Sequence, residues 1–214
     1  LFLLTLGTLG FYLLEHHNPA TMGTLNAAGK FQAAFFQSVT TRTAGFASIS
    51  QSGLTNGSKL LASMLMIIGG SPAGTAGGIK TTTVAVLLLT AISVLRGNKD
   101  TECYGRKITF EIIRVGITIT LVTFVFWLFG VTVMTVIEPQ QKVLDLMFEA
   151  TSAMATVGLT ADLTPVLSDI SHVVLMLMMY IGRIGPMTMA LIFSGHVDKK
   201  NQFRTLPEAK IMVG

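Results

Sequence analysis

Apolar residues along this chain gather in five stretches that are separated by polar, turn-rich segments. The apolar stretches cover residues 1–14, 60–68, 79–95, 115–137 and 170–193. The polar segments cover residues 15–30, 96–111, 138–145 and 194–210. A membrane-spanning helix needs roughly 20 apolar residues, and the stretch 115–137 meets that length alone. The pattern predicts an all-α integral membrane protein.

The beginning of the chain is read as part of a longer helix. The sequence opens with Leu1-Phe2-Leu3-Leu4 and has no initiator methionine. A signal peptide would carry basic residues before its apolar run, and none precede this one. The run 1–14 is also shorter than a spanning helix. We therefore expect a chain that extends further upstream.

Composition and charge agree with a bilayer environment. Half of the 214 residues are hydrophobic and 12% are charged, whereas soluble domains contain about 25% charged residues. The net charge of +4 is small for a nucleic-acid partner, and none is expected. The single cysteine, Cys103, excludes a disulfide framework or a multi-thiolate metal site and is read as an inert thiol. The apolar stretches contain no paired acids and no nucleophile–base arrangement, so an enzyme is not expected.

Lys and Arg residues indicate the orientation of the chain. They gather in the linker 96–114 and in the tail 196–214, at Arg96, Lys99, Arg106, Lys107, Arg114, Lys199, Lys200, Arg204 and Lys210. Cytoplasmic segments carry such an excess, so the linker and the C-terminus are expected inside the cell. The mildly apolar segments 31–50 and 146–161 must then leave and return on the outer side, as re-entrant loops.

An internal repeat has an offset of 113 positions. Gly45 then aligns with Gly158, and the neighbouring pairs are Phe35 with Phe148, Thr43 with Thr156, Phe46 with Leu159, and Ile68-Gly69 with Ile181-Gly182. This agreement predicts two tandem helix–pore loop–helix repeats, over residues 1–95 and 115–195. The linker 96–114 joins the repeats and the tail 196–214 follows them.

The two pore loops are predicted to bind a potassium ion through backbone carbonyl oxygens. The carbonyls belong to Thr43, Ala44, Gly45 and Phe46 and to Thr156, Val157, Gly158 and Leu159. Rings of carbonyls replace the hydration shell of potassium, and glycine permits the backbone angles required. Short helices are expected before the loops, at 29–39 and 142–152, with their partially negative ends toward the ion. We expect Arg42 and Glu149 to brace the loops through hydrogen bonds.

A glycine-rich segment, 69–78, interrupts the second membrane segment and is interpreted as an intramembrane gate. Its candidate gating residues are Gly70, Ser71, Gly74, Thr75, Gly77 and Gly78. Interruptions of this kind recur at ion pathways. Arg183 lies in the last apolar stretch, where a charge is a candidate functional group. We hypothesise that Arg183 contacts the gate carbonyls and restrains the gate; bracing of helix packing alone is the alternative.

Three motifs resemble the Trk/Ktr/HKT superfamily of potassium transporters, especially membrane subunits of the KtrB type. They are Phe36–Phe46, Gly74–Thr82 and Tyr180–Pro186, and the tail Pro207–Gly214 is similar as well. The resemblance implies four helix–pore–helix repeats around one pore, of which this chain matches the third and fourth. It also implies Gly45 and Gly158 as filter glycines, the segment 69–78 as the gate, and Arg183 facing it. The first two repeats, an N-terminal half, must then come from elsewhere.

The same resemblance implies partners and a location. Such subunits form homodimers, and Gly214 fits a terminal carboxylate used in the dimer contact. They sit on a cytosolic ring of nucleotide-binding regulatory subunits, in the lipid of a bacterial plasma membrane, and transport is often linked to sodium. The expected function is potassium translocation as the membrane subunit of a Ktr-type uptake system. A sodium-permeable relative and a non-conducting membrane scaffold with degenerate pore loops remain the alternatives.

Overall fold

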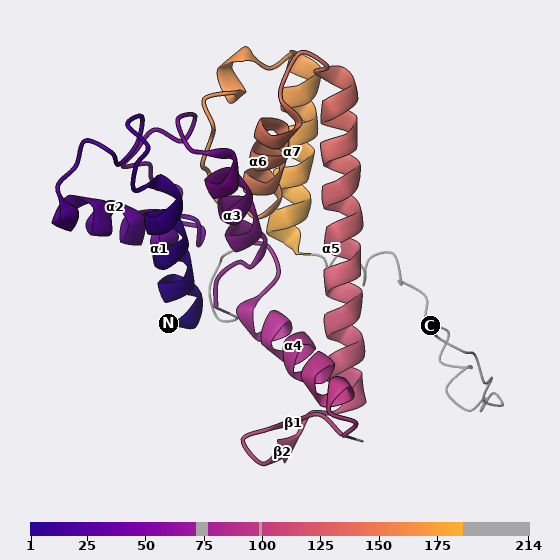
Figure 1. The fold of residues 1–214 in the computed structure, drawn as a ribbon. Coiled ribbons are helices and arrows are strands. Elements are labelled where there is room, and N and C mark those ends of the chain that lie inside the picture. The colour runs from indigo at the N-terminus through magenta and orange to yellow at the C-terminus, as the bar shows by residue number, and fades with distance from the viewer. Residues whose placement is uncertain (72–76, 99, 186–214) are drawn as a thin grey trace.

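The computed structural model describes residues 1–71, 77–98 and 100–185, and these are mostly helical (Figure 1). The elements in chain order are α1 (Phe2–Glu15), α2 (Ala27–Thr40), α3 (Asn56–Ile67), α4 (Thr81–Leu95), β1 (Glu102–Cys103), β2 (Arg106–Lys107), α5 (Phe110–Ile137), α6 (Val143–Met154), the 3-10 turn η1 (Thr164–Val166) and α7 (Asp169–Ile184). The strands β1 and β2 pair antiparallel in the linker between α4 and α5. Apolar periodicity does not predict this small hairpin, because its strand residues are mostly polar and, apart from the half-buried Cys103, exposed.

The helices form two similar units. Each begins with an outer helix (α1 or α5), continues into a short helix (α2 or α6) and a loop, and ends in an inner helix (α3 or α7). Asn56 begins α3 and Asp169 begins α7, and these residues are 113 positions apart. The short helices predicted before the loops are confirmed as α2 and α6.

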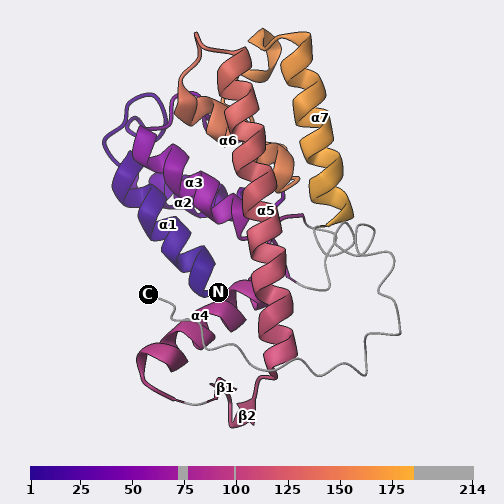
Figure 2. The ribbon, with the colours of Figure 1, turned by 90° about the vertical axis from the view of Figure 1, so that its right-hand side faces the viewer.

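Helix α5 runs from the top of the molecule to the region just above the β1–β2 hairpin (Figures 1 and 2). Its 28 residues correspond to a length of about 42 Å, compared with about 30 Å for the hydrocarbon core of a bilayer. Among the described residues, α5 alone is long and apolar enough to cross a membrane, while α1 and α4 are shorter apolar helices. The span predicted at 115–137 is therefore confirmed as a helix of sufficient length.

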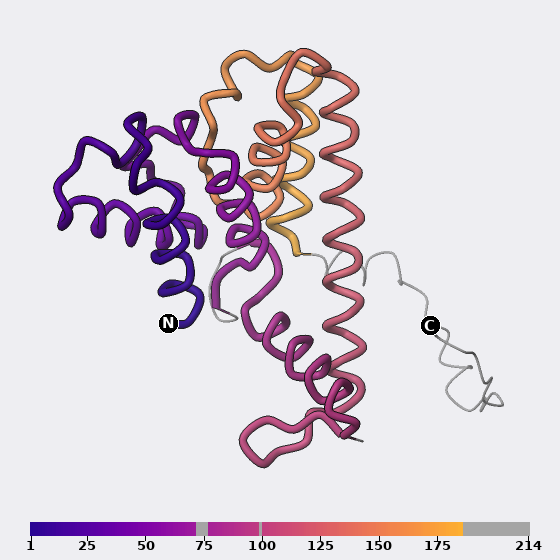
Figure 3. Tube along the Cα trace, in the orientation of Figure 1, coloured from indigo at the N-terminus to yellow at the C-terminus, as the bar shows by residue number. Residues whose placement is uncertain are grey.

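A break separates α3 from α4 at mid-height, where the chain changes direction (Figure 3). The two rims of this break, residues 67–71 and 77–79, lie next to each other, because Ile68 and Ile79 form an isolated parallel bridge. The N–H of Ile79 also donates to the carbonyl of Ile67 over 3.0 Å. The interruption predicted in the second membrane segment is thus present, with both of its rims held next to each other.

The buried core consists of two clusters, and the first joins the two units. It contains Phe11 of α1 and Met66 of α3 together with Phe148, Val157 and Leu159 of the second unit. The second cluster lies between α5, α6 and α7 and includes Val131, Met134, Leu146, Leu175 and Met178. The loop after α6 is therefore anchored by side chains of the preceding unit.

Each unit also ties its outer helix to its inner helix through a carboxylate. Glu15 at the end of α1 accepts hydrogen bonds from the N–H and the hydroxyl of Thr55, at 2.9 and 2.8 Å. Glu138 after α5 accepts from the N–H of Ser168 and the hydroxyl of Ser171, both at 2.8 Å. Thr55 and Ser168 are the N-caps of α3 and α7 and lie 113 positions apart. These bonds occupy N–H groups that a helix start leaves unpaired.

Candidate functional site

The two pore loops contain left-handed backbone at matching positions. The φ angles are 67° at Thr43 and 76° at Gly45, and 53° at Thr156 and 94° at Gly158. A positive φ is an outlier for a β-branched residue such as threonine, and backbone strain of this kind gathers at functional sites. Left-handed residues at every second position allow successive carbonyl oxygens to point to one side, as a ring around an ion requires.

Side chains of the second loop are buried on one side of the strand. Val157 and Leu159 are 5% and 3% exposed and belong to the first core cluster, whereas Gly158 between them is exposed. The equivalent residues of the first loop, Ala44 and Phe46, are exposed, Phe46 to 71%. The second loop thus packs on the first unit, and the matching face of the first loop is open in this chain.

Polar contacts with α2 hold the first loop. The N–H groups of Ala44 and Gly45 donate to the carbonyl of Thr40, and the Thr40 hydroxyl donates to the carbonyl of Phe46 over 2.5 Å. Behind the loop, the buried amides of Gln37 and Gln51 donate to each other over 2.6 and 3.1 Å. Buried hydrogen bonds of this kind fix the path of a loop that has no regular secondary structure.

Glu149 of α6 holds the second loop. Its carboxylate accepts from the Thr160 hydroxyl at 2.5 Å, the Ala161 N–H at 2.9 Å and the Thr164 hydroxyl at 3.0 Å. The predicted bracing role of Glu149 is therefore confirmed. Thr164 lies 113 positions after Gln51, so both units use the same loop position to bond their short helix.

The two loops meet at their glycines. A methyl group added to Gly45 would collide with the carbonyl oxygen of Val157, and one added to Gly158 would lie 3.8 Å from the Cα of Gly45. Further along, the hydroxyl of Ser52 donates to the Asp162 carboxylate over 2.6 Å. Residues more than 100 positions apart in the sequence thus form one site.

The second rim of the gate segment, which begins at Gly77, contacts the second loop directly. The N–H of Gly77 donates to the hydroxyl oxygen of Thr156 over 3.0 Å. A side chain at Gly77 would also collide with this threonine and with the carbonyl of Ala155. Gly78 has a φ of 71°, which favours glycine. The sequence therefore places a glycine, Gly77, where the gate segment contacts the second loop.

Arg42 differs in part from the prediction that it braces a pore loop. Its guanidinium donates to the carbonyl of Gly69 over 2.8 Å, and this hydrogen bond ties the first loop to the other rim of the gate segment. Ala155, which is 113 positions further on, lies against Gly77 and Gly78. The same position in each unit thus meets one end of the gate segment.

Arg183 lies in the last turn of α7. It lines a cavity of about 560 Å³ together with residues that include Thr156, Leu159 and Glu149. Its predicted contact with the gate carbonyls remains a prediction. Three candidate residues, Gly74, Thr75 and Gly214, lie outside the described residues.

Several residues of this site were not singled out by the sequence analysis, namely Gln37, Gln51, Ser52, Ser152 and Asp162. Ser152 supplies both a carbonyl to the Val157 N–H and a hydroxyl to the Gly158 N–H, at 2.9 and 3.2 Å. The repeat offset of 113 positions could have indicated Gln51, because Gln51 aligns with Thr164 and each residue bonds the short helix of its own unit. The Gln37–Gln51 pair itself joins two uncharged residues 14 positions apart, and no motif indicates it.

Comparison with known proteins identifies relatives over nearly the whole chain. Residues 1–204 match the cation transport protein family TrkH. The Ktr system potassium uptake protein B of Bacillus subtilis is 36% identical over 214 residues, which are 100% of this chain and 47% of that protein. The protein of the same name from Vibrio alginolyticus is 38% identical over 192 residues, 90% of this chain and 42% of that protein.

A further relative and a solved structure agree with this match. The potassium/sodium uptake protein NtpJ of Enterococcus hirae is 34% identical over 215 residues, 99% of this chain and 48% of that protein. The crystal structure of the potassium transporter TrkH from Vibrio parahaemolyticus has a TM-score of 0.73 and 18% identity, and the match covers 90% of this chain and 42% of that chain. This structural likeness confirms the fold. The chain spans less than half the length of the relatives that it matches.

Proposed function

We propose, because this chain belongs to the TrkH family of cation transport proteins, that it forms one half of a potassium pathway across a bacterial plasma membrane. The carbonyl oxygens of residues 43–46 and 156–159 face the ion and replace its water. The observation that carries this proposal is the recurrence of left-handed threonine and glycine in two loops whose glycines touch. The relatives are transporters, and the chain acts in transport rather than as an enzyme.

The open face of the first loop supports a missing half that completes the pore. Phe35 and Phe46 are 49% and 71% exposed, whereas their equivalents Phe148 and Leu159 are 0% and 3% exposed. The second unit buries these positions against the first unit. We infer that an upstream unit, from the N-terminal half with the first two repeats, buries Phe35 and Phe46 in the same way.

Potassium is the ion that the loops favour, since both filter positions are glycine. A serine in place of a filter glycine would favour a sodium-permeable relative. The name of the Enterococcus hirae relative includes both potassium and sodium, so sodium remains the second candidate, as a permeant or a coupled ion. In the scaffold alternative, the loops bind no ion and flux is absent.

The segment 69–78 is proposed as the gate, with Gly70, Ser71, Gly74, Thr75, Gly77 and Gly78 as its moving residues. Two contacts support this assignment: Arg42 holds the carbonyl of Gly69, and Thr156 holds the N–H of Gly77. Each contact joins the gate to a residue in or next to a pore loop. Arg183, which lines a cavity together with Thr156, restrains the gate in this proposal.

The partners follow from the family and are proposed on that basis. Membrane lipid surrounds the helices, and the C-terminus faces the cytoplasm in a multi-pass topology. Two copies form a homodimer, and Gly214 lies in the dimer contact in this proposal. A cytosolic ring of nucleotide-binding subunits regulates the dimer, in a Ktr-type uptake system.

The test is rubidium uptake by the complete protein in lipid vesicles, with potassium or sodium as the competitor. Uptake that potassium blocks and sodium does not supports a potassium pathway. Equal block by both ions favours the sodium-permeable reading. Vesicles that take up no rubidium, with folded protein present, favour the scaffold.

A further inference from the structure

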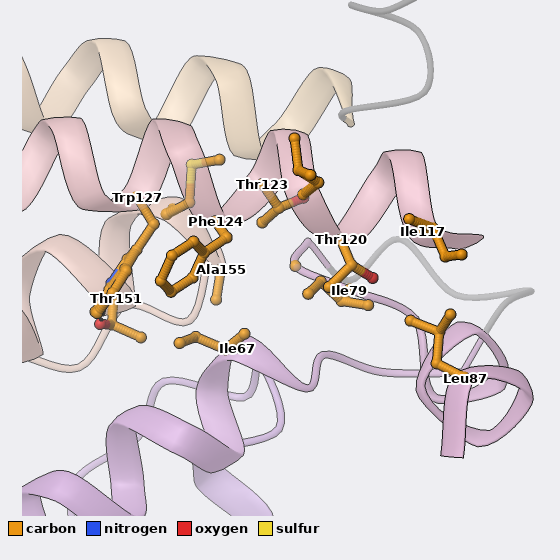
Figure 4. Close-up of a pocket in the computed structure, with 13 residues that line it drawn as sticks. Ile67, Ile79, Leu87, Ile117, Thr120, Thr123, Phe124, Trp127, Thr151 and Ala155 are labelled. Carbon is orange, nitrogen blue, oxygen red and sulfur yellow. Dashed lines mark hydrogen bonds between the residues drawn. The ribbon is translucent and has the colours of Figure 1, made fainter. Parts of the chain in front are cut away.

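An apolar crevice lies between α5, the second rim of the gate segment and the back of α6 (Figure 4). Its volume is about 440 Å³, and its lining includes Ile79 from the gate rim, Leu87 of α4, Thr120 and Phe124 of α5, and Ala155 before the second pore loop. The crevice shares no lining residue with the cavity that Arg183 lines. It therefore offers access to the gate and the pore loop from behind.

The polar groups of the crevice are already bonded to the protein. The hydroxyls of Thr120, Thr123 and Thr151 donate to carbonyls of their own helices, at 2.9, 2.7 and 2.6 Å. The indole N–H of Trp127 donates to the Thr151 hydroxyl over 2.8 Å. Because these donors are satisfied, the lining presents methyl groups and aromatic carbon. Such a cavity does not favour water or a polar ligand, because water needs several polar partners.

The mouth of the crevice is continuous with the apolar surface of α5. Ile117, Leu121 and Phe124 line it and are 51%, 59% and 55% exposed. The deep wall is buried, with Thr123, Ile79 and Ala155 at 4%, 5% and 2% exposed. In a membrane protein, the surface of a spanning helix meets lipid chains, which are the solvent at that depth.

We propose that one acyl chain of a bilayer phospholipid enters this crevice and lies against Ile79 and Ala155. The acyl chain fills a space that the described residues leave empty, since an empty apolar cavity loses dispersion contacts on every wall. It also blocks movement of the Gly78–Ile79 rim into the crevice, toward α5. This effect on gating rests on the proposed function, whereas the acyl-chain site itself is inferred only from the shape and the apolar lining of the crevice.

The binding test uses a phospholipid with a photoreactive diazirine in its acyl chain, in vesicles that contain the complete protein. We expect adducts at the mouth residues and also at the buried wall, at Ile79, Thr123 or Ala155. Thr120→Phe fills the crevice and should abolish the wall adducts. Thr118→Phe is the matched control, because Thr118 bonds a carbonyl of its own helix in the same way but is exposed outside the crevice. Leu87→Trp, with the exposed Leu88→Trp as its control, repeats the test from α4 if Thr120→Phe does not fold.

Three outcomes overturn the lipid site. In the first, the wild type is labelled at the mouth residues but not at the buried wall. In the second, adducts at the buried wall persist in both filling variants. In the third, neither the mouth nor the wall is labelled, because another part of the protein covers them. Rubidium uptake is measured in the same vesicles, in linear and in branched acyl-chain lipids. Wild-type uptake should differ between the lipids and uptake by Thr120→Phe should not. Uptake without wall adducts refutes the lipid site alone, and wall adducts without uptake refute the proposed function alone.

Discussion

Lys59 of α3 and Asp145 of α6 form an ion pair across the boundary between the two units. Their Nζ and Oδ1 atoms are 2.6 Å apart, and the side chains are only 8% and 20% exposed. The pair joins the inner helix of the first unit to the short helix that carries the second pore loop. Because it is largely buried at the boundary, this ion pair is expected to stabilise the contact between the two units, unlike a solvated surface pair.

Replacing Lys59 by methionine should destabilise this boundary. The substitution leaves the Asp145 carboxylate poorly solvated and without its cation, and breaking a buried pair in this way costs about 3 kcal/mol or more. We expect a lower unfolding midpoint in detergent, measured by denaturant titration. The double variant Lys59→Met/Asp145→Leu should recover part of the loss, because no unpaired charge remains.

The hairpin offers a matched control for that measurement. Lys107 and Asp100 also lie 2.6 Å apart, but they are 62% and 47% exposed. Exposed pairs contribute about 1 kcal/mol or less. Lys107→Met should therefore leave the midpoint nearly unchanged. Equal losses in the two single variants would contradict a special role for the Lys59–Asp145 pair.

Gly45→Ala should abolish discrimination between potassium and sodium in a protein that still folds. The added methyl group requires the Val157 carbonyl to move, and this oxygen belongs to the proposed ion path. The measurement is rubidium uptake with sodium as competitor, and we expect sodium to block as well as potassium does. Uptake that keeps its preference for potassium would contradict a filter at this position.

Gly97→Ala separates backbone strain from displacement of the carbonyl. Gly97 has a φ of 70°, close to the 76° of Gly45, but a methyl group there meets nothing within 4 Å. The strain of a left-handed alanine, about 1–2 kcal/mol, is then common to both variants. Gly97→Ala should lose some stability and keep its selectivity.

The sequence predicted the helices and the two loops because these features follow from local chemistry. Apolar runs specify helices α1, α4 and α5, and the glycine-rich segment specifies the break. The repeat offset then relates Gly45 to Gly158 without any knowledge of three-dimensional contacts. The same local reasoning reached Glu149, since a carboxylate next to a pore loop needs hydrogen-bond donors.

Contacts between residues far apart in the sequence could not be predicted by such reasoning. The bond from Arg42 to Gly69 spans 27 positions, and that from Gly77 to Thr156 spans 79. Each depends on how two helices pack, which the apolar pattern does not specify. The crevice likewise depends on packing between distant segments, because its lining comes from α3, α4, α5 and α6. The identity of its lining residues alone does not show that a space remains between them.

The hydrogen bonds that Glu138 accepts from the start of α7 should make the stability of the protein depend on pH. Hydrogen bonds from the side chain and backbone of Ser168, and then from Ser171, hold the pKa of Glu138 below its ordinary value. A lowered carboxyl pKa adds stability that is complete above the unfolded value of about 4.3 and is lost as the pH falls through the folded pKa. The unfolding temperature of the wild type should therefore fall more steeply below pH 5 than the unfolding temperature of Glu138→Gln. Ser171→Ala should lie between the two, and parallel curves for all three proteins would refute the effect.

Arg183→Ala should raise rubidium flux if Arg183 restrains the gate. Removing the guanidinium releases the restraint and leaves the pore loops in place. If Arg183 instead only braces helix packing, the variant should unfold more easily and its flux should not rise. Parallel measurements of uptake and of thermal unfolding in detergent distinguish the two roles. Unchanged flux in vesicles would count against the restraint.

Thr156→Val tests whether the second pore loop and the gate are coupled. Valine keeps the branched shape at a φ of 53° but removes the oxygen that accepts the Gly77 N–H. Thr43→Val removes a hydroxyl from the same position of the first loop, whereas the bond to Gly77 belongs to Thr156. If the hydroxyls serve only the ion, both variants should change rubidium binding alike. If the Gly77 bond holds the gate, only Thr156→Val should raise basal flux, because the freed N–H leaves that rim with one restraint fewer. We expect the second result, and equal basal flux in the two variants would refute the coupling.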